Sequence, residues 1–223
     1  MTTSRAAFEP QTTIEVQPGV RYLPGYLDAA GQQALLAVLR AAIAEAPLYQ
    51  PRMPRSGKPF SVQMTNCGPL GWVSDVSGYR YQPTHPETGE PWPPIPAIVL
   101  GAWVALSGDP RPPEACLVNY YAPVTRMGLH QDKDEADFSA PFVSLSLGDD
   151  ALFRVGGTRR SDPTRSFRLR TGDALVLAGK ARLAFHGVDR IIDGSSALLD
   201  DGGRFNLTLR RVSPPALDQS VTV

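Results

Sequence analysis

The feature that most constrains the fold is a series of short apolar segments in the second half of the chain, separated mainly by glycine, proline and aspartate. Glycine and proline are frequent throughout, with 20 and 22 occurrences in 223 residues. This pattern favours many short strands joined by tight turns over a bundle of helices. We expect strands at 115–121, 125–130, 141–147, 151–155, 166–170, 174–178, 182–186 and 204–211. Such strands predict an antiparallel jelly roll, or double-stranded β-helix, in which two facing sheets leave an open mouth for a ligand.

Two segments before these strands are expected to form helices that support a sheet. The first runs from 27 to 46, with Asp28 as its N-cap and Pro47 ending it. The second runs from 96 to 107 and has Trp103 on its apolar side. Residues 12–16 are expected to add an edge strand. The predicted fold class is therefore α+β but mainly β, with helices that buttress a jelly roll.

Residues 47–95 differ from both neighbouring segments, because they are rich in proline, glycine and aromatic residues and show little helical or strand periodicity. A segment of this length without regular structure usually forms a functional loop region or lid. Its aromatic side chains include Trp72, Tyr79 and Tyr81, which could either stack on nucleic-acid bases or form a small core of the lid itself. We expect His85 to be a solvated loop residue.

Composition and charge exclude several classes of protein. The 22 Lys and Arg residues balance the 22 Asp and Glu residues, so no overall charge attracts nucleic acid or an anionic membrane. No apolar run approaches the roughly 20 residues that a membrane span needs, and the first residues lack the apolar core of a secretion signal. We therefore expect a cytoplasmic protein without membrane contact, in which Cys67 and Cys116 remain reduced.

Three side chains form a candidate metal site. His130 and Asp132 are two residues apart, so on an extended segment their side chains leave the same face. His186, at the end of an apolar segment, is the expected third ligand. Two imidazoles and one carboxylate on one face of an octahedron suit non-haem Fe(II) and oxygen chemistry. These residues alone equally allow an exposed His130 and a core His186 that is bonded to the backbone.

The last predicted strand alternates strictly in polarity. Arg204, Asn206, Thr208 and Arg210 share one face, and three apolar residues share the other. This polar face is either the solvated side of an edge strand or part of the barrel interior, where two arginines need an anion because an unpaired buried charge is strongly unfavourable. A dicarboxylate cosubstrate would supply that anion, since a guanidinium group binds a carboxylate in bidentate fashion. The two arginines lie about 20 Å apart on an ideal strand, so Arg204 is the stronger candidate for the far carboxylate.

Several motifs, in this order, resemble the AlkB family of Fe(II)- and 2-oxoglutarate-dependent nucleic-acid demethylases. They are Asn-Tyr-Tyr-Ala-Pro from 119, Leu-His-Gln-Asp-Lys-Asp-Glu from 129, Val-Ser-Leu-Ser-Leu-Gly from 143, Phe-His-Gly from 185 and Arg-Phe-Asn-Leu-Thr-Leu-Arg from 204. The likeness extends into the lid through Met-Thr-Asn-Cys-Gly from 64, Gly-Trp from 71 and Gly-Tyr-Arg-Tyr from 78. The resemblance implies a jelly-roll dioxygenase with an N-terminal nucleotide-recognition lid, with Fe(II) as its metal and with 2-oxoglutarate and O2 as cosubstrates.

The resemblance also implies a role for each matching residue. The expected iron ligands, which are also the catalytic residues, are His130, Asp132 and His186. The expected 2-oxoglutarate contacts are Asn119, Tyr121, Arg204, Asn206 and Arg210. The expected substrate contacts are Trp72 and Tyr79 in the lid, Asp134 at the amino edge of the damaged base, and Arg160.

The reaction that the resemblance implies is oxidative demethylation, a direct repair of N-alkylated bases such as 1-methyladenine and 3-methylcytosine. Formaldehyde leaves the base while 2-oxoglutarate is converted to succinate and carbon dioxide. A base is extruded more cheaply from a single strand and when methylation already blocks its pairing. Single-stranded DNA, or alternatively RNA, is therefore the expected partner. Residues 154–170 contain six arginines and one acid, which indicates either a basic patch beside the mouth or a solvated pair of strands.

We expect the whole chain, residues 1–223, to act as one monomeric catalytic domain. Within it we expect the first helix and the lid at 14–95, the jelly-roll core at 96–213 and a tail at 214–223. Other functions stay open at this point: a 2-oxoglutarate-dependent hydroxylase of a small molecule or protein, a nucleic-acid-binding module without catalysis, and a zinc hydrolase. The intact ligand set argues against a pure binding module, and a zinc hydrolase would leave Arg204 unexplained.

Overall fold

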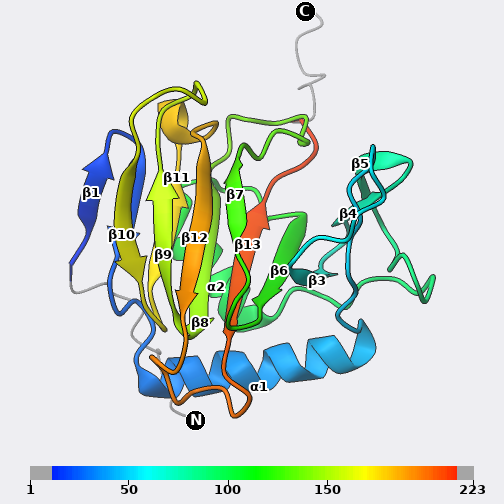
Figure 1. The fold of residues 1–223 in the computed structure, drawn as a ribbon. Helices are drawn as coiled ribbons and strands as arrows, with labels where there is room; N and C mark the ends of the chain where they lie inside the picture. Colours follow the sequence, from blue (N-terminus) through cyan, green and yellow to red (C-terminus); the bar gives the residue numbers. More distant parts are fainter. Residues whose placement is uncertain (1–11, 215–223) are drawn as a thin grey trace, which may run out of the picture.

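The computed structural model describes residues 12–214, which form two facing β-sheets, a separate β-hairpin and two α-helices (Figure 1). The helices are α1 (Ala29–Glu45) and α2 (Ala97–Leu106). The strands are β1 (Ile14–Gln17), β2 (Val20–Leu23), β3 (Gln63–Cys67), β4 (Gly71–Asp75), β5 (Gly78–Gln82), β6 (Ala115–Tyr121), β7 (Met127–His130), β8 (Phe142–Gly148), β9 (Asp150–Val155), β10 (Arg165–Leu169), β11 (Ala174–Leu177), β12 (His186–Ile192) and β13 (Arg204–Arg210).

The two facing sheets confirm the predicted jelly roll. The major sheet has seven strands in the order β1-β2-β11-β8-β13-β6-β3, and the minor sheet has four in the order β10-β9-β12-β7. Their strand pairs are antiparallel. β1 lies at the edge of the major sheet, as the sequence predicts for the segment around residue 14. The hairpin of β4 and β5 stands apart from both sheets.

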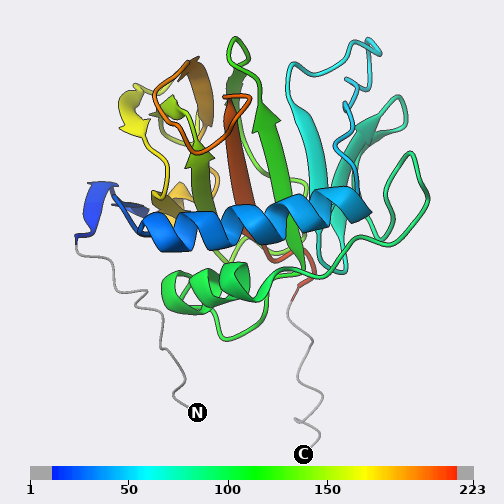
Figure 2. The same ribbon diagram turned by 90° about the horizontal axis from the view of Figure 1, so that it is seen from below.

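Both helices lie across the outer face of the major sheet (Figure 2). The side chain of Asp28 caps α1 by accepting a hydrogen bond from the backbone N–H of Gly31 at 2.7 Å, as predicted. Leu35 and Leu39 of α1 and Trp103 of α2 are fully buried in a core that also contains the apolar face of the sheet. The helices therefore act as buttresses, which leaves the opposite face of the major sheet free to enclose a site.

β13 is an interior strand of the major sheet and lies between β8 and β6. Its Leu207 and Leu209 belong to the helix-side core, whereas Arg204 and Arg210 face the space between the sheets and are only 1% and 5% exposed. The strict alternation is confirmed, and the reading of this polar face as the solvated side of an edge strand is wrong. Two cations are therefore buried inside the barrel.

Residues 47–95 contain more regular structure than their sequence predicts. β3 pairs with β6 and completes the major sheet, and β4 and β5 form a hairpin. The sequence of β3 does not indicate a buried strand, because it contains polar residues. In the structure, the buried polar side chains of β3 form hydrogen bonds to the backbone of the protein. Thr65 donates to the carbonyl oxygen of Ala46, and Asn66 bonds both the N–H and the C=O of Trp72. Only the remainder of this segment is loop.

His85 is not the solvated loop residue that the sequence suggested, since it is only 1% exposed. Its Nδ1 accepts hydrogen bonds from the backbone N–H groups of Glu87 and Thr88 at 3.1 and 3.2 Å. Its Nε2 lies 2.8 Å from the carbonyl oxygen of Pro47, and the rings of Tyr49 and Trp92 lie beside it. His85 therefore organises the turn that follows the hairpin, and composition alone does not reveal these backbone contacts.

The predicted strand at 182–186 is also wrong. A 3-10 turn, η1 (Gly179–Ala181), begins at a glycine with φ +53° and continues into turn-like backbone, and β12 starts only at His186. The backbone N–H of Ala184 bonds the carbonyl oxygen of Ala181, which belongs to a turn rather than to a strand ladder. His186 thus begins its strand instead of ending one.

The remaining structural expectations concern the thiols, membrane segments and the tail. Cys67 and Cys116 are free and buried, and they lie opposite each other on β3 and β6. None of the helices within residues 12–214 is long and apolar enough to cross a membrane. The predicted tail at 214–223 lies, apart from its first residue, outside the described part of the chain.

Candidate active site

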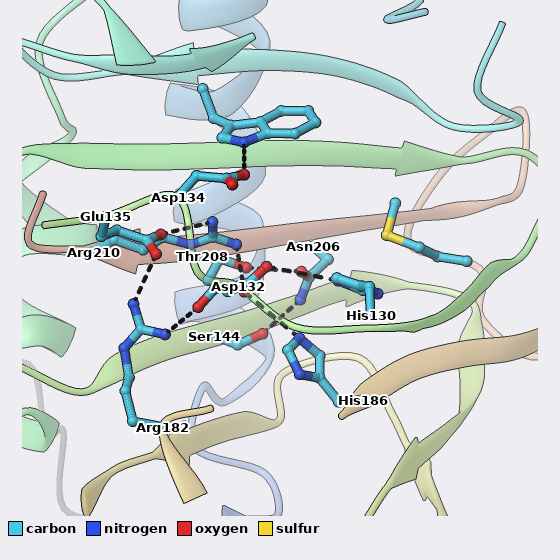
Figure 3. A network of polar contacts seen from close by, with 12 residues as sticks. His130, Asp132, Asp134, Glu135, Ser144, Arg182, His186, Asn206, Thr208 and Arg210 are labelled. Carbon is cyan, nitrogen blue, oxygen red and sulfur yellow. Dashed lines mark hydrogen bonds and ion pairs between the residues drawn. The ribbon is translucent and has the colours of Figure 1, made fainter. Parts of the chain in front are cut away.

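Three side chains with metal-binding groups converge between the sheets. His130 ends β7 and lies directly opposite His186, the first residue of β12. Asp132 follows His130 by two residues, and its carboxylate lies 3.7 Å from His130 Nε2 and 3.5 Å from His186 Nε2. One potential ligand atom from each residue lies within 4.8 Å of the other two. The structure therefore brings together the three residues expected to bind iron (Figure 3).

The backbone fixes how both imidazoles are presented. His130 Nδ1 lies 2.9 Å from the carbonyl oxygen of Gly128, and His186 Nδ1 lies 2.9 Å from that of Ala184. A carbonyl oxygen only accepts, so each neutral ring must carry its proton on Nδ1 and donate it there. Both Nε2 atoms are then unprotonated and directed toward Asp132. This is the tautomer in which two histidines can bind one cation.

The charges around the triad also suit a metal. Burial and, to a smaller extent, the neighbouring His186 lower the pKa of His130 to about 4. Burial alone would raise the pKa of Asp132, but the neighbouring Arg210 guanidinium holds it well below its ordinary value. At neutral pH the site therefore offers a neutral His130 and an ionised Asp132, which are protonation states that bind metal ions.

A single cavity of about 550 Å³ contains the triad and opens between the sheets and the lid. Its volume lies within the range typical of small-molecule sites. Every side chain predicted to bind metal, cosubstrate or substrate lines this cavity: Trp72, Tyr79, Asn119, Tyr121, His130, Asp132, Asp134, Arg160, His186, Arg204, Asn206 and Arg210. Residues as far apart in the chain as Trp72 and Arg210 thus line the same cavity.

The inner end of the cavity is built around Arg204. Its guanidinium donates to Ser146 Oγ at 2.5 Å and to the carbonyl oxygens of Asp149 and Leu169 at 3.0 and 3.2 Å. Its Nε has no hydrogen-bond partner among the described residues, and no carboxylate in residues 12–214 forms an ion pair with it. Burial lowers the pKa of Arg204 to about 10. A buried cation without a counter-ion fits an anionic ligand.

Three further residues predicted to contact 2-oxoglutarate lie near this cation. The Oδ1 atom of Asn119 is buried and has no hydrogen-bond partner within the described chain. Tyr121 is 3% exposed, and within residues 12–214 its hydroxyl bonds only the sulfur of Met127, at 3.8 Å. The amide nitrogen of Asn206, by contrast, already donates to Ser144 Oγ at 2.6 Å. Asn119 and Tyr121 therefore offer free polar atoms to a ligand, whereas the amide nitrogen of Asn206 is engaged.

Arg210 lies at the opposite end of β13 from Arg204 and has different partners. It donates to Asp132 Oδ2 at 2.7 Å and to Glu135 Oε1 at 3.1 Å, and its Nε has no partner among the described residues. Its guanidinium thus bonds a proposed iron ligand directly. The two arginines do not converge on one point, which agrees with the length of the strand between them.

The lid covers the triad with aromatic residues. The rings of Trp72 on β4 and Tyr79 on β5 are stacked, with centroids 5.5 Å apart and an interplanar angle of 20°. Trp72 Nε1 donates to Asp134 Oδ2 at 2.8 Å, which joins the lid to the loop after β7. Trp72 is 9% exposed, whereas Tyr79 is 48% exposed. The carboxylate expected to contact a base is thus held by the lid.

The arginine-rich segment is less basic than its sequence indicates. Arg154 pairs with Asp189 at 2.9 Å, and Arg168 lies 3.5 Å from Asp150. Both acids lie outside the stretch 154–170, so a count of charges within that stretch does not include them. Arg160 donates to the carbonyl oxygen of Leu129 at 2.9 and 3.1 Å, which brings it to the cavity wall.

Sequence reasoning missed the buried polar contacts of three residues beside the triad. Tyr81, Glu135 and Arg182 bond one another or Arg210 beneath the lid. Glu135 belongs to an acidic run after His130, a composition typical of exposed segments, yet its side chain is fully buried. The signal for this burial would have been the pairing of Glu135 with Arg182. Arg182, however, lies in the segment that the sequence wrongly assigns to a strand.

Residues 19–210 match the family model described as the 2OG-Fe(II) oxygenase superfamily. A protein of Caulobacter vibrioides named alpha-ketoglutarate-dependent dioxygenase AlkB homolog is 54% identical over 198 residues, which cover 89% of this chain and 90% of that protein. The chain belongs to the AlkB family.

More distant AlkB-family proteins agree with this assignment. An Arabidopsis thaliana protein named DNA N(6)-methyladenine demethylase ALKBH1C is 34% identical over 226 residues, covering 88% of this chain and 49% of that protein. The solved structure titled "The structure of OsALKBH1" superposes with a TM-score of 0.75 and 32% identity, covering 90% of this chain and all of that one. Fold and family therefore agree.

As an AlkB-family protein, the chain is an Fe(II)- and 2-oxoglutarate-dependent dioxygenase that uses O2 as its other cosubstrate. The side chains of the cavity fit these groups. Two Nε2 atoms and an ionised carboxylate form the donor set of non-haem Fe(II) sites. The unpaired guanidinium of Arg204 suits a small anion beside that metal.

Proposed function

We propose that this protein removes methyl groups from the nitrogen atoms of damaged bases in single-stranded nucleic acid. The observation that carries the proposal is the composition of one cavity, in which a metal triad, an unpaired buried arginine and an aromatic lid with a carboxylate meet. The triad and the arginine serve any 2-oxoglutarate dioxygenase, whereas the lid supplies a flat aromatic surface and a hydrogen-bond acceptor suited to a base. The demethylase name of the Arabidopsis relative supports the same substrate class.

In this proposal each end of the cavity has its own task. His130, Asp132 and His186 hold Fe(II), and Arg204 binds the far carboxylate of 2-oxoglutarate. Asn119 and Tyr121 add polar contacts to the cosubstrate, and Asn206 and Arg210 line the part of its site closest to the metal. Bound Fe(II), with 2-oxoglutarate and O2, supplies the oxidation of a methyl C–H bond to an alcohol while 2-oxoglutarate becomes succinate and carbon dioxide.

The chain itself contributes placement of the base. Trp72 holds Asp134 through its indole N–H, which leaves the second carboxylate oxygen able to accept from the exocyclic amino group of the base. His130 and the lid aromatics provide apolar faces for stacking, and Tyr79 and Arg160 lie at the wall where the strand would pass. The hydroxymethyl group formed on nitrogen then leaves as formaldehyde, which restores the base.

A single strand is the expected form of the substrate. The target base must leave its stack to enter a walled cavity, and this costs least when the base is unpaired. The exposed ring of Tyr79 and the free charges among the arginines of residues 154–170 suit a flexible backbone of either DNA or RNA. 1-Methyladenine and 3-methylcytosine are the expected lesions, because each has an exocyclic amino edge beside the methylated nitrogen.

The test is an assay of two products. Protein reconstituted with Fe(II) without oxygen is mixed with 2-oxoglutarate, O2 and an oligonucleotide that carries 1-methyladenine or 3-methylcytosine. We expect formaldehyde and succinate in equal amounts, faster with a single strand than with a duplex. Parallel DNA and RNA oligonucleotides of one sequence give the preference between the two. Succinate without formaldehyde for both lesions would overturn the demethylase proposal and leave a hydroxylase of another substrate.

The organisation of the protein completes this proposal. We expect one monomeric catalytic domain that works in the cytoplasm, with a helix and lid before residue 96 and the jelly-roll core after it. The pairing of β3 with β6 supports a unit that cannot be divided at residue 96 without opening the major sheet. Light scattering on the purified protein and fractionation of its host cells test the oligomeric state and the compartment.

A further inference from the structure

A buried carboxylate outside the proposed ligand set joins three parts of the site. Glu135 Oε1 accepts a hydrogen bond from the hydroxyl of Tyr81 at 2.6 Å and one from Arg210 at 3.1 Å. Its Oε2 lies 3.2 Å from Nη2 of Arg182. Figure 3 shows Glu135 between Arg210 and Arg182, next to Asp132. The side chain of Glu135 has no exposed surface, so among the described residues these contacts replace its hydration.

These contacts fix the position of Arg210. Its other terminal nitrogen donates to Asp132 Oδ2 at 2.7 Å, so one guanidinium bridges Glu135 and the proposed iron ligand. Two buried cations, Arg182 and Arg210, balance the two buried carboxylates of Asp132 and Glu135. A cation that bonds a metal ligand opposes a bound metal ion electrostatically, and a neighbouring carboxylate offsets that effect.

Arg182 holds the loop that carries these acids. Its Nη1 donates to the backbone carbonyl oxygen of Asp132 at 2.9 Å, and its Nε donates to that of Ala140 at 3.1 Å. Its guanidinium also packs against the rings of Phe138 and Phe142. The stretch from 132 to 140 is therefore tied at both ends and, through Glu135, in its middle.

Tyr81 brings the lid into this arrangement. It lies on β5, paired with Trp72 on β4, and Trp72 bonds Asp134, the residue next to Glu135. Each strand of the lid hairpin therefore contacts one acid of the loop. A movement of the hairpin that breaks the bond from Tyr81 removes a partner from both Glu135 and Arg210.

We propose that Glu135 is a positioning residue that couples the lid to the iron-binding carboxylate, acting through Arg210. The inference rests on the proposed role of Asp132 as a metal ligand. With the lid in place, Tyr81 and Arg182 hold Glu135, and Glu135 holds Arg210 against Asp132. Opening of the lid loosens Asp132, which weakens metal binding. It also lowers the fraction of turnovers in which the base is oxidised.

The experiment compares two tyrosines whose hydroxyls donate to carboxylates. Tyr81→Phe removes the bond to Glu135 at 2.6 Å, and Tyr22→Phe removes a bond to Asp173 at 2.8 Å, and neither Tyr22 nor Asp173 lines the cavity. Mn(II), which binds without redox chemistry, is titrated into each metal-free protein by calorimetry. We expect Tyr81→Phe to raise the Kd for Mn(II) about tenfold, as outer partners of metal ligands do. We expect Tyr22→Phe to leave the Kd unchanged.

Two further readouts separate positioning from general destabilisation. Tyr81→Phe should lower the ratio of formaldehyde to succinate, while its Tm falls no more than that of Tyr22→Phe. Glu135→Gln keeps the shape of the side chain and should raise the Kd for Mn(II) at least as much. If Glu135→Gln does not fold, the comparison of the two tyrosine variants decides alone.

The outcomes distinguish the two proposals. Wild-type protein that does not bind Mn(II) would overturn the metal site, and the coupling with it. Wild-type protein that binds Mn(II), with equal Kd values and equal product ratios for Tyr81→Phe and Tyr22→Phe, would overturn the coupling and leave the proposed function intact. A raised Kd and a lowered product ratio in Tyr81→Phe alone support it.

Discussion

The inner end of the cavity and its lid are built in opposite ways. The inner end consists of side chains from central strands of the major sheet, and it leaves buried polar atoms without partners, namely Arg204 Nε and Asn119 Oδ1. The lid is a separate hairpin, and two of its side chains bond the adjoining loop: Trp72 bonds Asp134, and Tyr81 bonds Glu135. At the inner end, polar atoms beside the cavity lack partners, whereas these lid side chains already have partners within the protein.

This difference follows from what each region has to bind. Groups held rigidly in a sheet can bind a cosubstrate that always has the same shape. The missing hydrogen bonds of these groups destabilise the empty site, and the bound cosubstrate offsets that cost. A base in a variable sequence has to be admitted and released, so the lid needs contacts that can be exchanged. We therefore expect substitutions at the inner end to act on metal and cosubstrate, and substitutions of lid residues without a contact to Glu135 or Arg210, such as Tyr79, to act on the oligonucleotide alone.

Asp132→Ala tests the inner end with the largest expected effect. It removes the only carboxylate of the proposed triad, so Mn(II) binding measured by calorimetry and all succinate formation should disappear. Asp134→Ala, two residues away, should keep both and change the preference between methylated bases. Because Asp132→Ala leaves Arg210 with one buried partner fewer, Asp132→Asn serves as a second variant if the first does not fold. Equal loss of metal in the Asp132 and Asp134 variants would contradict the role given to Asp134.

Arg204→Lys should have the next largest effect, and it should be confined to the cosubstrate. Lysine keeps the charge but loses the planar fork, so the KM for 2-oxoglutarate should rise about tenfold to a hundredfold. The increase in Tm on adding 2-oxoglutarate should shrink with it, while the KM for the oligonucleotide stays the same. Arg168→Lys, at an exposed arginine near Asp150, is the control. It should change neither the KM for 2-oxoglutarate nor the increase in Tm on adding 2-oxoglutarate. A normal KM for 2-oxoglutarate in Arg204→Lys would remove the assigned partner of the far carboxylate.

Tyr79→Ala examines the lid in the same way. The loss of one base-stacking ring costs about 1 to 3 kcal/mol of binding, so the KM for a methylated single strand should rise about fivefold to a hundredfold. The Tm should change little, because 48% of the residue is exposed and its hydroxyl contacts only the sulfur of Met53. Tyr79→Phe keeps the ring and should behave almost as the wild type. If Tyr79→Ala raised the KM for 2-oxoglutarate instead, the division of the cavity into two regions would be wrong.

The two regions also differ in how well the sequence predicts them. The inner end follows from periodicity, because the alternation of β13 puts Arg204 and Arg210 on one face whatever the rest of the fold does. That face is buried only if β13 has a neighbouring strand on each side. The many strands that the sequence predicts made this arrangement expected. The start of β12 was misjudged, since the turn at Gly179 depends on its positive φ and on contacts from Arg182, which no local pattern encodes.

The lid was predicted by composition, and composition does not identify partners. His85 and Glu135 both look solvated in sequence, one beside prolines and the other in an acidic run. Both are buried because backbone N–H groups surround the first and two arginines surround the second. These partners come from distant or irregular segments, so only the assembled structure reveals them. The resemblance to AlkB located the residues of the cavity, but not the connections between them.

The smallest expected effect concerns the exposed end of the lid hairpin. Arg80 pairs with Asp75 at 2.8 Å and, with the N–H of Ser77, lowers the pKa of Asp75 to about 2 from 3.8. Because the folded pKa is depressed, the pair stabilises the hairpin above pH 3.8 and this contribution is lost as the pH falls toward 2. Asp75→Asn should therefore lower the free energy of unfolding by at most about 1 kcal/mol at neutral pH, since the pair is exposed. The difference from the wild type should vanish in acid and shrink in high salt, while the Kd for Mn(II) stays the same. A variant that weakened Mn(II) binding would show that even the tip of the lid is coupled to the metal, and the contrast between the two regions would then be one of degree.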